Sequence, residues 1–400
     1  MSTLYTLKWV LSKNGYYKLM VTAKNNMTRE VKPVLIEDLD EFKSKNKNLE
    51  VIDKYEEILE DLFLVRNPRF KMNPDYKANF EAFKKEHAPD GDLTKVGNWF
   101  YFPWSKKLVH FLEDSLHQEI RTARNKNIIT REEQEKLYNS TVAIAGLSVG
   151  SHAALTISMM GMCRKIKLAD PDEISASNLN RIRYDYTKIG RNKAEVAAEY
   201  IYQMNPYAEV ELYTKGVSEE NMDEFLSDID VLVEEMDNLA MKIYIREQAK
   251  KKEIPVIMAT DNGDNVIFDI ERYDLDPNLK IFNGVAGDLT LEEFKKVKPE
   301  EMPKLATKIA GADMVVPRML MSLKEVGKTL YSWPQTGDAA TLAGITIAHV
   351  VKRLVLGEPL KTEKLDVNID SVFDPDYNSE KSKEERQEIR TAFKKGVGLE

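Results

Sequence analysis

The sequence predicts an α/β protein with a Rossmann-like, doubly wound and mostly parallel sheet, an antiparallel addition, and a small N-terminal α+β domain. Three observations indicate this fold class. From about residue 140, apolar β-branched runs alternate with segments of helical spacing, as in parallel sheets with crossover helices. A glycine-containing turn joins the first run to the first helical segment. After Thr260, the turn-like residues 262–265 precede another strand-like run, which indicates an antiparallel pair appended to the sheet.

The predicted elements alternate in chain order. Strands are predicted at 141–146, 165–170, 209–213, 229–234 and 254–260. Helices are predicted at 151–161, 190–205, 239–252 and 338–356, and a charged, solvated helix at 379–395. The predicted domains are an N-terminal α+β extension at 1–98, an aromatic connector and helix at 99–139, the main α/β domain at 140–375 and a charged C-terminal helix at 376–400.

The N-terminal extension shows two kinds of periodicity. Residues 1–35 alternate apolar and polar positions around Asn14-Gly15, which predicts a β-hairpin. Residues 37–65 have helical spacing, which places on one face Val51, Tyr55, Ile58, Leu62 and Val65. We interpret the aromatic run 99–104 as a wedge that packs the extension onto the main domain. The alternative is a binding surface for a ligand or peptide.

Composition limits the functional classes. Lys and Arg number 58 against 66 Asp and Glu, and the net charge of −8 argues against nucleic acid or an acidic membrane as partner. The single cysteine, Cys163, excludes an intrachain disulfide and a cysteine-cluster zinc site. The first residues lack a signal-peptide core, and no uninterrupted apolar run approaches the about 20 residues of a membrane span. We therefore expect a cytoplasmic protein without zinc.

The first strand–turn–helix unit carries the candidate chemistry. In GLSVGS, Gly146 and Gly150 let the backbone approach phosphates, and the following helix N-terminus favours their charge. Asp170 ends the next strand, where a carboxylate can accept a ribose hydroxyl. The same letters match the G-x-S-x-G elbow of hydrolases, with Ser148 as nucleophile. Its downstream histidine would be His349, which we interpret as a core residue, so the hydrolase is the minor alternative.

The stretch that follows resembles the ThiF/MoeB/ubiquitin-activating-enzyme superfamily of ATP-dependent adenylating enzymes. Five features occur in family order within roughly 120–270. They are Asp170-Pro171-Asp172, the run 177–181 (SNLNR), the run 190–193 (GRNK), Met204-Asn205-Pro206 and Met236-Asp237-Asn238. The flanks GNWFYFPWSKKLVHFL, RNKNIITREEQEKL and SWPQ look like a bacterial branch with an N-terminal extension.

The resemblance implies an ATP site. Asp170 would hold the ribose, while Asn178, Arg181 and Lys193 would contact the triphosphate and offset its charge. The nucleotide-binding set that the family implies is Gly146, Ser148, Gly150, Asp170, Asp172, Asn178, Arg181 and Lys193.

The resemblance also implies Mg²⁺ and a homodimer. Asp237 would bind Mg²⁺ and position the reacting groups. Family members often add an arginine from the partner subunit, and Arg124 is the matching residue here, with Arg121 as the reserve. The implied catalytic residues are therefore Arg181, Lys193, Asp237 and Arg124.

Several departures from the family pattern limit the reactions that we expect after adenylation. The glycine loop is one residue shorter, with Ser148 in place of a glycine, and Ile182 replaces the usual glutamine. The paired CxxC zinc ligands are absent, and no cysteine follows Asp237. We therefore expect an acyl-adenylate that is captured directly, without a thioester intermediate.

The sequence leaves the activated carboxylate open. A ribosomal peptide under maturation is one candidate, and strands at 3–10 and 16–23 could help bind it by strand addition. A structural or dimerisation role for this extension is equally compatible. A ubiquitin-like or sulfur-carrier protein and a small-molecule or tRNA-bound carboxylate are the other candidates. Readings of another class are an NAD- or FAD-dependent oxidoreductase and a non-catalytic nucleotide-binding scaffold.

Overall fold

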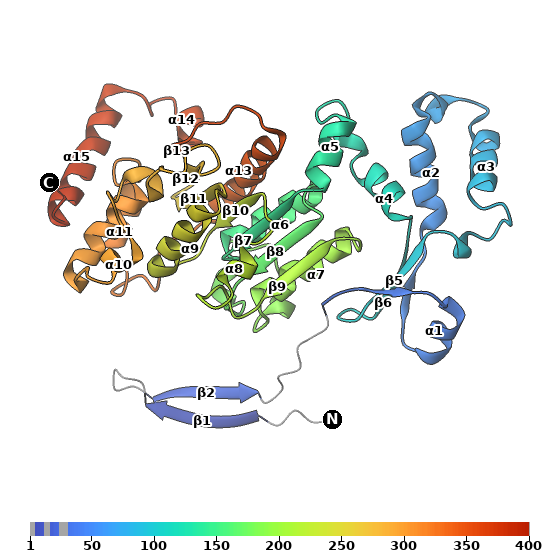
Figure 1. Ribbon diagram of the computed structural model, residues 1–400, viewed down its shortest axis with the longest axis horizontal. Helices are drawn as coiled ribbons and strands as arrows, with labels where there is room; N and C mark the ends of the chain where they lie inside the picture. The colour runs from blue at the N-terminus through green and yellow to red at the C-terminus, as the bar shows by residue number, and fades with distance from the viewer. Residues whose placement is uncertain (1–4, 12–16, 24–30, 400) are drawn as a thin grey trace.

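A computed structural model of the chain describes residues 5–11, 17–23 and 31–399 (Figure 1). Its largest sheet has seven strands in the order β13-β12-β11-β10-β7-β8-β9. The strands are β7 (Thr141–Ala145), β8 (Lys165–Ala169), β9 (Glu209–Tyr213), β10 (Val231–Glu234), β11 (Val256–Asn262), β12 (Asn265–Glu271) and β13 (Lys364–Val367). Strands β9, β8, β7, β10 and β11 run parallel, whereas β12 and β13 are antiparallel additions. The predicted fold class is confirmed.

Helices cover both faces of this sheet. The helices of the main domain are α6 (Val149–Met159), α7 (Lys193–Met204), α8 (Met222–Phe225), α9 (Leu239–Lys251), α10 (Leu291–Phe294), α11 (Met302–Ala310), α12 (Pro317–Leu323), α13 (Gly337–Leu356), α14 (Asp370–Phe373) and α15 (Glu380–Gly396). Alternate residues of β7 enter opposite cores: Val142 and Ile144 pack with α6, α7 and α13, whereas Ala143 and Ala145 pack with α8 and α9. This alternation follows from the two-residue period of a strand.

Helix α13 is a core element. By length and composition it is long and apolar enough to cross a membrane, and among the described residues it is the one helix that is. Its buried face includes Ala340, Ala343, Gly344 and Ile347, which lie in the core shared with α6 and the sheet. A core helix of a globular domain is often as long and as apolar as a membrane-spanning helix. The buried face of α13 is typical of such a core helix.

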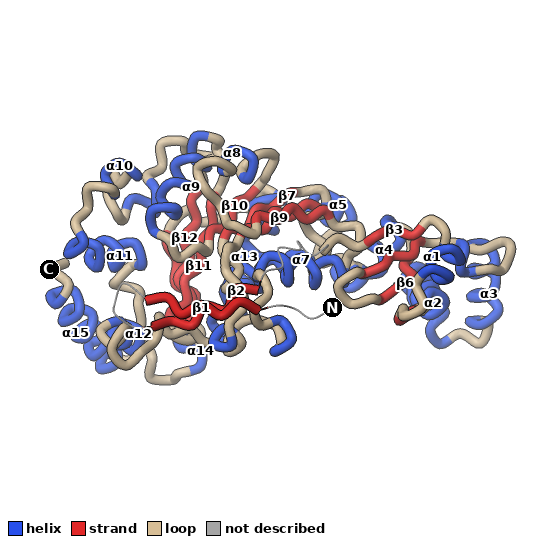
Figure 2. The backbone as a smooth tube through the Cα atoms, turned by 90° about the horizontal axis from the view of Figure 1, so that it is seen from below, coloured by secondary structure: helices blue, strands red, loops and turns tan. Residues whose placement is uncertain are grey.

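The N-terminal part forms a second, smaller sheet in the order β3-β5-β6-β4. Its strands are β3 (Val34–Ile36), β4 (Glu50–Ile52), β5 (Asn98–Phe102) and β6 (Lys107–Phe111). The accompanying helices are α1 (Leu39–Lys45), α2 (Tyr55–Arg66), α3 (Tyr76–His87), α4 (Asp114–Arg121) and α5 (Arg131–Tyr138). The tube view shows that this sheet and α1–α3 extend from one end of the main domain (Figure 2).

Short 3-10 helices and one hairpin complete the chain. The 3-10 helices are η1 (Pro68–Met72), η2 (Leu93–Lys95), η3 (Ala123–Asn125), η4 (Ala176–Asn178), η5 (Tyr186–Lys188), η6 (Ile281–Gly284) and η7 (Pro299–Glu301). Strands β1 (Tyr5–Leu11) and β2 (Tyr17–Ala23) pair antiparallel, as the alternation predicts. The predicted turn at Asn14-Gly15 lies outside the described residues.

The aromatic run, which was predicted to begin a connector, forms a strand of the N-terminal sheet. Residues 98–102 form β5, which pairs with both β3 and β6 and so belongs to the N-terminal sheet. Phe100 and Phe102 are buried in the main core, and Phe100 meets Tyr207 edge-on at a ring separation of 5.1 Å. The run therefore packs the small sheet onto the main domain, as the preferred interpretation holds. The sequence could not predict that the run belongs to this sheet, because cross-strand pairing joins residues that are far apart in sequence.

Two other predicted elements need correction. Val51 does not share a helix face with Tyr55 because it lies in β4, and α2 begins only at Tyr55. The three-residue strand is too short for its periodicity to be read from sequence. The C-terminal helix is not fully solvated, because Phe393 of α15 is buried against Leu320 and Val315 beside α12.

Candidate functional site

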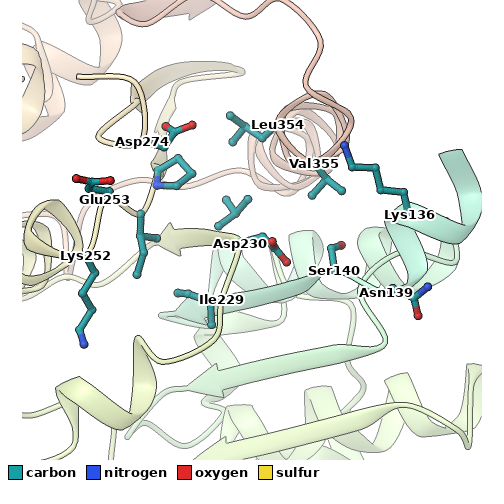
Figure 3. A pocket seen from close by; sticks show the side chains of 13 residues that line it. Lys136, Asn139, Ser140, Ile229, Asp230, Lys252, Glu253, Asp274, Leu354 and Val355 are labelled. Atoms are coloured by element: carbon teal, nitrogen blue, oxygen red, sulfur yellow. The ribbon is translucent and has the colours of Figure 1, made fainter. Parts of the chain in front are cut away.

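The predicted site residues lie at the carboxyl-terminal edge of the parallel strands. Ligands of open α/β sheets bind at this edge, where loops leave the strands. A hollow of about 600 Å³ lies at the opposite, amino-terminal edge, where its lining includes Ser140, Asp230 and Pro255 (Figure 3). Each of these residues precedes its strand. We therefore assign the candidate site to the carboxyl-terminal edge, on geometry rather than on the size of a hollow.

The glycine turn after β7 is held by two neighbouring strands. Gly146 has φ +92°, and a Cβ added there would lie 2.3 Å from the carbonyl oxygen of Glu235. Leu147 donates its backbone N–H to Asp170 Oδ2 at 2.6 Å. A Cβ on Gly150 would lie 2.9 Å from Ile144 Cγ2. The glycines therefore allow the turn to pack directly against the backbone of the loop after β10. Helix α6 then begins beside Asp170.

Asp170, Asp172 and Lys193 form one ion-paired group. Asp170 is 4% exposed, and its Oδ1 accepts the N–H of Asp172 at 2.8 Å. Lys193 Nζ lies 2.9 Å from Asp172 Oδ2 and 3.8 Å from Asp170 Oδ2. Burial raises the pKa of Asp170, and the nearby Lys193 opposes this rise. Asn192 caps α7 and donates to the carbonyl oxygen of Asp170 at 2.9 Å, so the helix start is tied to the end of β8.

Replacing Lys193 with alanine is expected to weaken ATP binding roughly ten- to hundredfold, the effect of losing one charge-assisted hydrogen bond of about 1.5–3 kcal/mol. Isothermal titration with Mg·ATP measures this directly. Lys188→Ala is the matched control, because Lys188 pairs at 3.2 Å with the buried Glu199 and has no nucleotide role. Equal ATP affinities for wild type and Lys193→Ala would remove Lys193 from the phosphate site.

Arg181 reaches the glycine turn from the loop after η4. Its Nε donates to Ser148 Oγ at 3.2 Å, and its Nη1 donates to Asn180 Oδ1 at 3.1 Å. Burial lowers the pKa of Arg181, while the charges of Asp261 and Asp237 act to raise it. Arg181 is therefore bonded to the turn and lies close enough to both carboxylates for their charges to act on it.

Asn178 and His152 shape the backbone around Arg181. Asn178 Oδ1 accepts the N–H of Ser175 at 3.0 Å, which uses its carbonyl group to build the local turn. His152 Nε2 donates to the carbonyl oxygen of Arg181 at 2.5 Å. His152 is 2% exposed, and burial lowers its pKa. The sequence analysis does not nominate His152 as a site residue, because its contact with Arg181 joins two segments that no linear motif connects.

Asp237 lies in an exposed turn between β10 and α9. Asn238 caps α9 by accepting the N–H of Met241 at 3.1 Å, and Glu235 accepts the N–H of Ala259 at 2.7 Å. Burial raises the pKa of Glu235 well above its usual range. Asp237 itself makes no hydrogen bond to another side chain of the described chain, so its carboxylate is available to a ligand.

The two arginines before the main domain differ in environment. Arg124 is exposed in η3 and has no ion pair or hydrogen bond to another described side chain. Arg121 donates to the carbonyl oxygen of Ser158, and to Gln118 Oε1 at 2.9 Å, so it is a packing residue. Asn125 donates to the carbonyl oxygen of Met160 at 3.0 Å, which places η3 beside the C-terminal end of α6. An 11-residue helix spans about 16 Å. Arg124 is therefore remote from its own chain's glycine turn.

Asp261 is a site residue that sequence reasoning missed. It is 3% exposed, its Oδ2 accepts from Gln335 Nε2 at 3.0 Å, and its Oδ1 has no hydrogen-bond partner among the described residues. Gln335 belongs to the SWPQ segment, and its carbonyl oxygen accepts from Asn180 Nδ2 at 2.7 Å. Burial raises the pKa of Asp261 to about 6, with Asp338 acting in the same direction and Gln335 and Arg181 against it.

The raised pKa of Asp261 predicts a pH-dependent stability. The folded carboxyl keeps its proton up to about pH 6, whereas its ordinary pKa is 3.8, so this group lowers folding stability as the pH rises between these values. Two pKa units correspond to about 3 kcal/mol. Against Asp261→Asn in chemical denaturation, wild type should lose up to about 3 kcal/mol between about pH 4 and 6.5. A constant difference across this range would contradict the raised pKa.

The structure weakens two other chemistries. Cys163 is 2% exposed beside Ser140 at the opposite edge of the sheet, and burial raises its thiol pKa to about 12. It is therefore a core residue and not a nucleophile. His349 is exposed, which corrects its interpretation as a core residue, since it lies on the outer face of α13. The Ser148 hydroxyl accepts a hydrogen bond from Arg181 and, within the described chain, makes none with a histidine side chain.

The donor set fits a nucleotide and a divalent cation. Arg181 and Lys193 would offset the charge of a bound phosphate, and the start of α6 offers backbone N–H groups. These two cations stand among carboxylates, so a divalent cation would balance the charge. Mg²⁺ is usually held by one or two carboxylates together with substrate phosphates, and the exposed Asp237 meets that requirement. This arrangement defines an adenylyltransferase-like, Rossmann-type nucleotide-binding protein.

Comparisons with known proteins agree with this class. A family model described as "ThiF family" matches residues 122–282. The protein MT1398 of Mycobacterium tuberculosis (strain CDC 1551 / Oshkosh) is 37% identical over 287 residues, which are 72% of this chain and 40% of that protein. The tRNA threonylcarbamoyladenosine dehydratase of Bacillus subtilis (strain 168) is 32% identical over 190 residues, which are 45% of this chain and 72% of that protein. The chain belongs to the ThiF family.

A solved structure also resembles this fold. E. coli tRNA N6-threonylcarbamoyladenosine dehydratase, TcdA, in complex with AMP, shares 17% sequence identity and aligns with a TM-score of 0.44. The alignment covers 61% of this chain and 97% of that chain.

Proposed function

We propose that this chain catalyses Mg·ATP-dependent adenylation of a carboxylate, with release of pyrophosphate. The observation that carries the proposal is the convergence of Arg181, Lys193, Asp170 and Asp237 around one glycine turn. Asp170 holds the ribose, and the two cations offset charge that grows as the carboxylate attacks the α-phosphorus. When bound, Mg²⁺ supplies charge neutralisation at the phosphates, and Asp237 is the residue that holds it.

We propose a homodimer in which Arg124 acts on the partner subunit's nucleotide. Two observations support this arrangement. Arg124 is exposed without a partner side chain in the described chain, and α6 separates it from its own glycine turn. Arg124 is exposed and does not hold its own chain together, so it is free to contact a nucleotide in the partner subunit.

The acyl group passes to its acceptor without a thioester. The sole cysteine, Cys163, is buried in the core at the other edge of the sheet. A covalent relay through this chain therefore has no thiol near Asp237. Direct capture of the acyl-adenylate by the acceptor is the remaining route.

The substrate class that we propose is a carboxylate on a peptide. Strand β3 is an end strand of the N-terminal sheet, so among the described strands its outer edge is unpaired. Val34 and Leu35 of this strand are 36% and 49% exposed. An extended peptide can add to such an edge through main-chain hydrogen bonds. Leu35→Pro should then weaken peptide-dependent turnover and leave ATP binding unchanged.

A second candidate substrate is a tRNA-bound carboxylate. The similarity to the Bacillus subtilis protein named tRNA threonylcarbamoyladenosine dehydratase favours it. The net charge of −8 argues against it, because tRNA binding relies on basic surface.

The first test of the proposal is ligand-induced thermal stabilisation. Mg·ATP, NAD, NADP and FAD are each added to wild type and to Arg181→Ala. A ligand at about 100 times its Kd adds about 2.7 kcal/mol of stability. We expect a shift with Mg·ATP that Arg181→Ala loses. A shift with NAD or FAD alone would indicate an oxidoreductase, and no shift with any ligand would indicate a scaffold.

The second test measures AMP and pyrophosphate release. The probes are peptides with a free C-terminal carboxylate, tRNA carrying N6-threonylcarbamoyladenosine, and a small carrier protein ending in Gly-Gly. We expect release with the peptides. Release with the tRNA or the carrier protein alone would retain adenylation and replace the peptide as substrate.

A further inference from the structure

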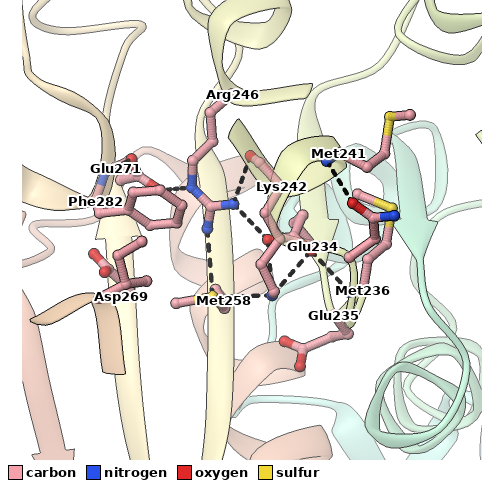
Figure 4. A network of polar contacts seen from close by, with 12 residues as sticks. Glu234, Glu235, Met236, Met241, Lys242, Arg246, Met258, Asp269, Glu271 and Phe282 are labelled. Atoms are coloured by element: carbon pink, nitrogen blue, oxygen red, sulfur yellow. Dashed lines mark hydrogen bonds and ion pairs between the residues drawn. The ribbon is translucent and has the colours of Figure 1, made fainter. Parts of the chain in front are cut away.

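A buried ionic network lies at the end of β10, beside Met236, the residue that precedes Asp237 (Figure 4). Glu234, the last residue of β10, is 0% exposed, and both of its oxygens lie 3.1 Å from Lys242 Nζ. Its Oε2 also accepts from Arg246, which is 0% exposed and whose Nε donates to Glu271 at 2.7 Å. Arg246 further stacks over the ring of Phe282, with Cζ 4.2 Å from the ring centroid. One helix face of α9 therefore supplies both cations.

This network is connected to the backbone of the turn. Glu234 Oε1 accepts the N–H of Met236 at 2.7 Å, so the carboxylate that pairs with Lys242 also fixes the residue before Asp237. On the other side, Asn238 is fixed as the cap of α9. Asp237 thus stands between two residues that are each held by a hydrogen bond, Met236 and Asn238.

Charge balance makes each member depend on the others. Glu234 pairs with both Lys242 and Arg246, and Arg246 also pairs with Glu271; the carboxyl groups of Glu235 and Asp269 lie beside this network (Figure 4). Burial alone would raise the pKa of Glu234, but Lys242 and Arg246 hold it below the usual value. Buried ion pairs contribute little net stability compared with apolar residues of similar size. Removing one partner of such a pair leaves an uncompensated buried charge and is destabilising, so a test of one member needs a readout other than stability. The network also contacts the backbone of the turn, because Glu234 accepts the N–H of Met236.

We propose that Lys242 is a positioning residue for Asp237, and that it acts through Glu234 and the N–H of Met236. Lys242 is the member of the network that is partly exposed, with its side chain 16% accessible, whereas Glu234 and Arg246 are fully enclosed. When Lys242 loses its ammonium group, Arg246 is the remaining cation that pairs with Glu234. The carboxylate of Glu234 is then held less firmly, and so is the hydrogen bond that it accepts from the N–H of Met236. The proposal rests on the proposed function, because it concerns the divalent cation that Asp237 would hold.

The test is the Mg²⁺ concentration at which ATP stabilises the protein half-maximally in thermal melts. Lys242→Met should raise this concentration roughly tenfold, the usual effect of losing a residue that orients a metal ligand. Lys242→Arg, which keeps the charge, should restore it. Lys167→Met is the matched control, because this buried lysine donates to the carbonyl oxygens of Glu224 and Ser227, far from the turn in the chain.

The outcomes separate the two proposals. If wild type shows no Mg²⁺-dependent stabilisation by ATP, the proposed function fails. If wild type responds and Lys242→Met has the same Mg²⁺ midpoint, only the positioning role fails. An equal shift in Lys167→Met would show that the effect is one of general stability and would also overturn it. Lys242→Gln, which retains a hydrogen-bond donor, gives the same comparison if Lys242→Met does not fold.

Discussion

Gly146→Ala is expected to abolish ATP binding while the protein remains folded. The added Cβ would lie 2.3 Å from the carbonyl oxygen of Glu235 and 2.8 Å from the backbone nitrogen of Met236, and its φ of +92° disfavours any side chain. Because both neighbours are backbone atoms, the glycine turn and the Asp237 turn must separate. The phosphate-binding N–H groups and the proposed Mg²⁺ ligand then lose their mutual placement.

Titration calorimetry and Mg·ATP-induced thermal stabilisation check this expectation, and circular dichroism checks the fold. Gly190→Ala is a suitable control, since Gly190 also has a positive φ, of +78°, but a Cβ added there would meet no atom within 4 Å beyond its chain neighbours. It carries the conformational cost without the clash. Normal ATP affinity in Gly146→Ala would show that the glycine turn does not bind the nucleotide as we propose.

Asp237→Ala is expected to lower turnover by at least about a hundredfold, with little change in melting temperature. The expected loss reflects the magnitude seen when one charge-stabilising group is removed from an active site. Stability should hold because Asp237 is exposed and makes no hydrogen bond to another side chain in the described part of the chain. The measurement is pyrophosphate release with the substrate that the second test of the proposed function identifies.

Asp223→Ala provides the control for Asp237→Ala. Asp223 is likewise exposed, and its ion pair, at 3.2 Å, is with Lys252 on the surface. Its removal should leave turnover unchanged. Full activity in Asp237→Ala would withdraw this residue from the proposed reaction, whatever its effect on Mg²⁺ binding.

The main sheet could be predicted from sequence because its strands are buried on both faces. Runs such as 142–145 and 231–233 are continuous and apolar, and the helices between the strands have clear helical spacing. The N-terminal sheet was harder to predict because β3 and β4 have three residues each, too few for a period. Their pairing with β5 and β6 is a contact between distant segments that local patterns do not record.

The candidate site divides in the same way. Arg181, Lys193 and Asp237 stand in linear motifs, so their order along the chain was enough to nominate them. Asp261 and His152 were missed because each acts through a partner from another element: Gln335 before α13, and the Arg181 backbone. Such partners come together only when the sheet is assembled.

One consequence concerns the crossing of α13 over α6. A Cβ on Gly344 would lie 2.3 Å from the Cβ of His152, and the imidazole of His152 holds the carbonyl oxygen of Arg181. A side chain at position 344 would push α6 outward and move that imidazole with it. The distance between α13 and α6 is therefore coupled to the position of Arg181. A change in one changes the other. A substitution in the hydrophobic core at this crossing would behave in an assay like a substitution in the nucleotide site.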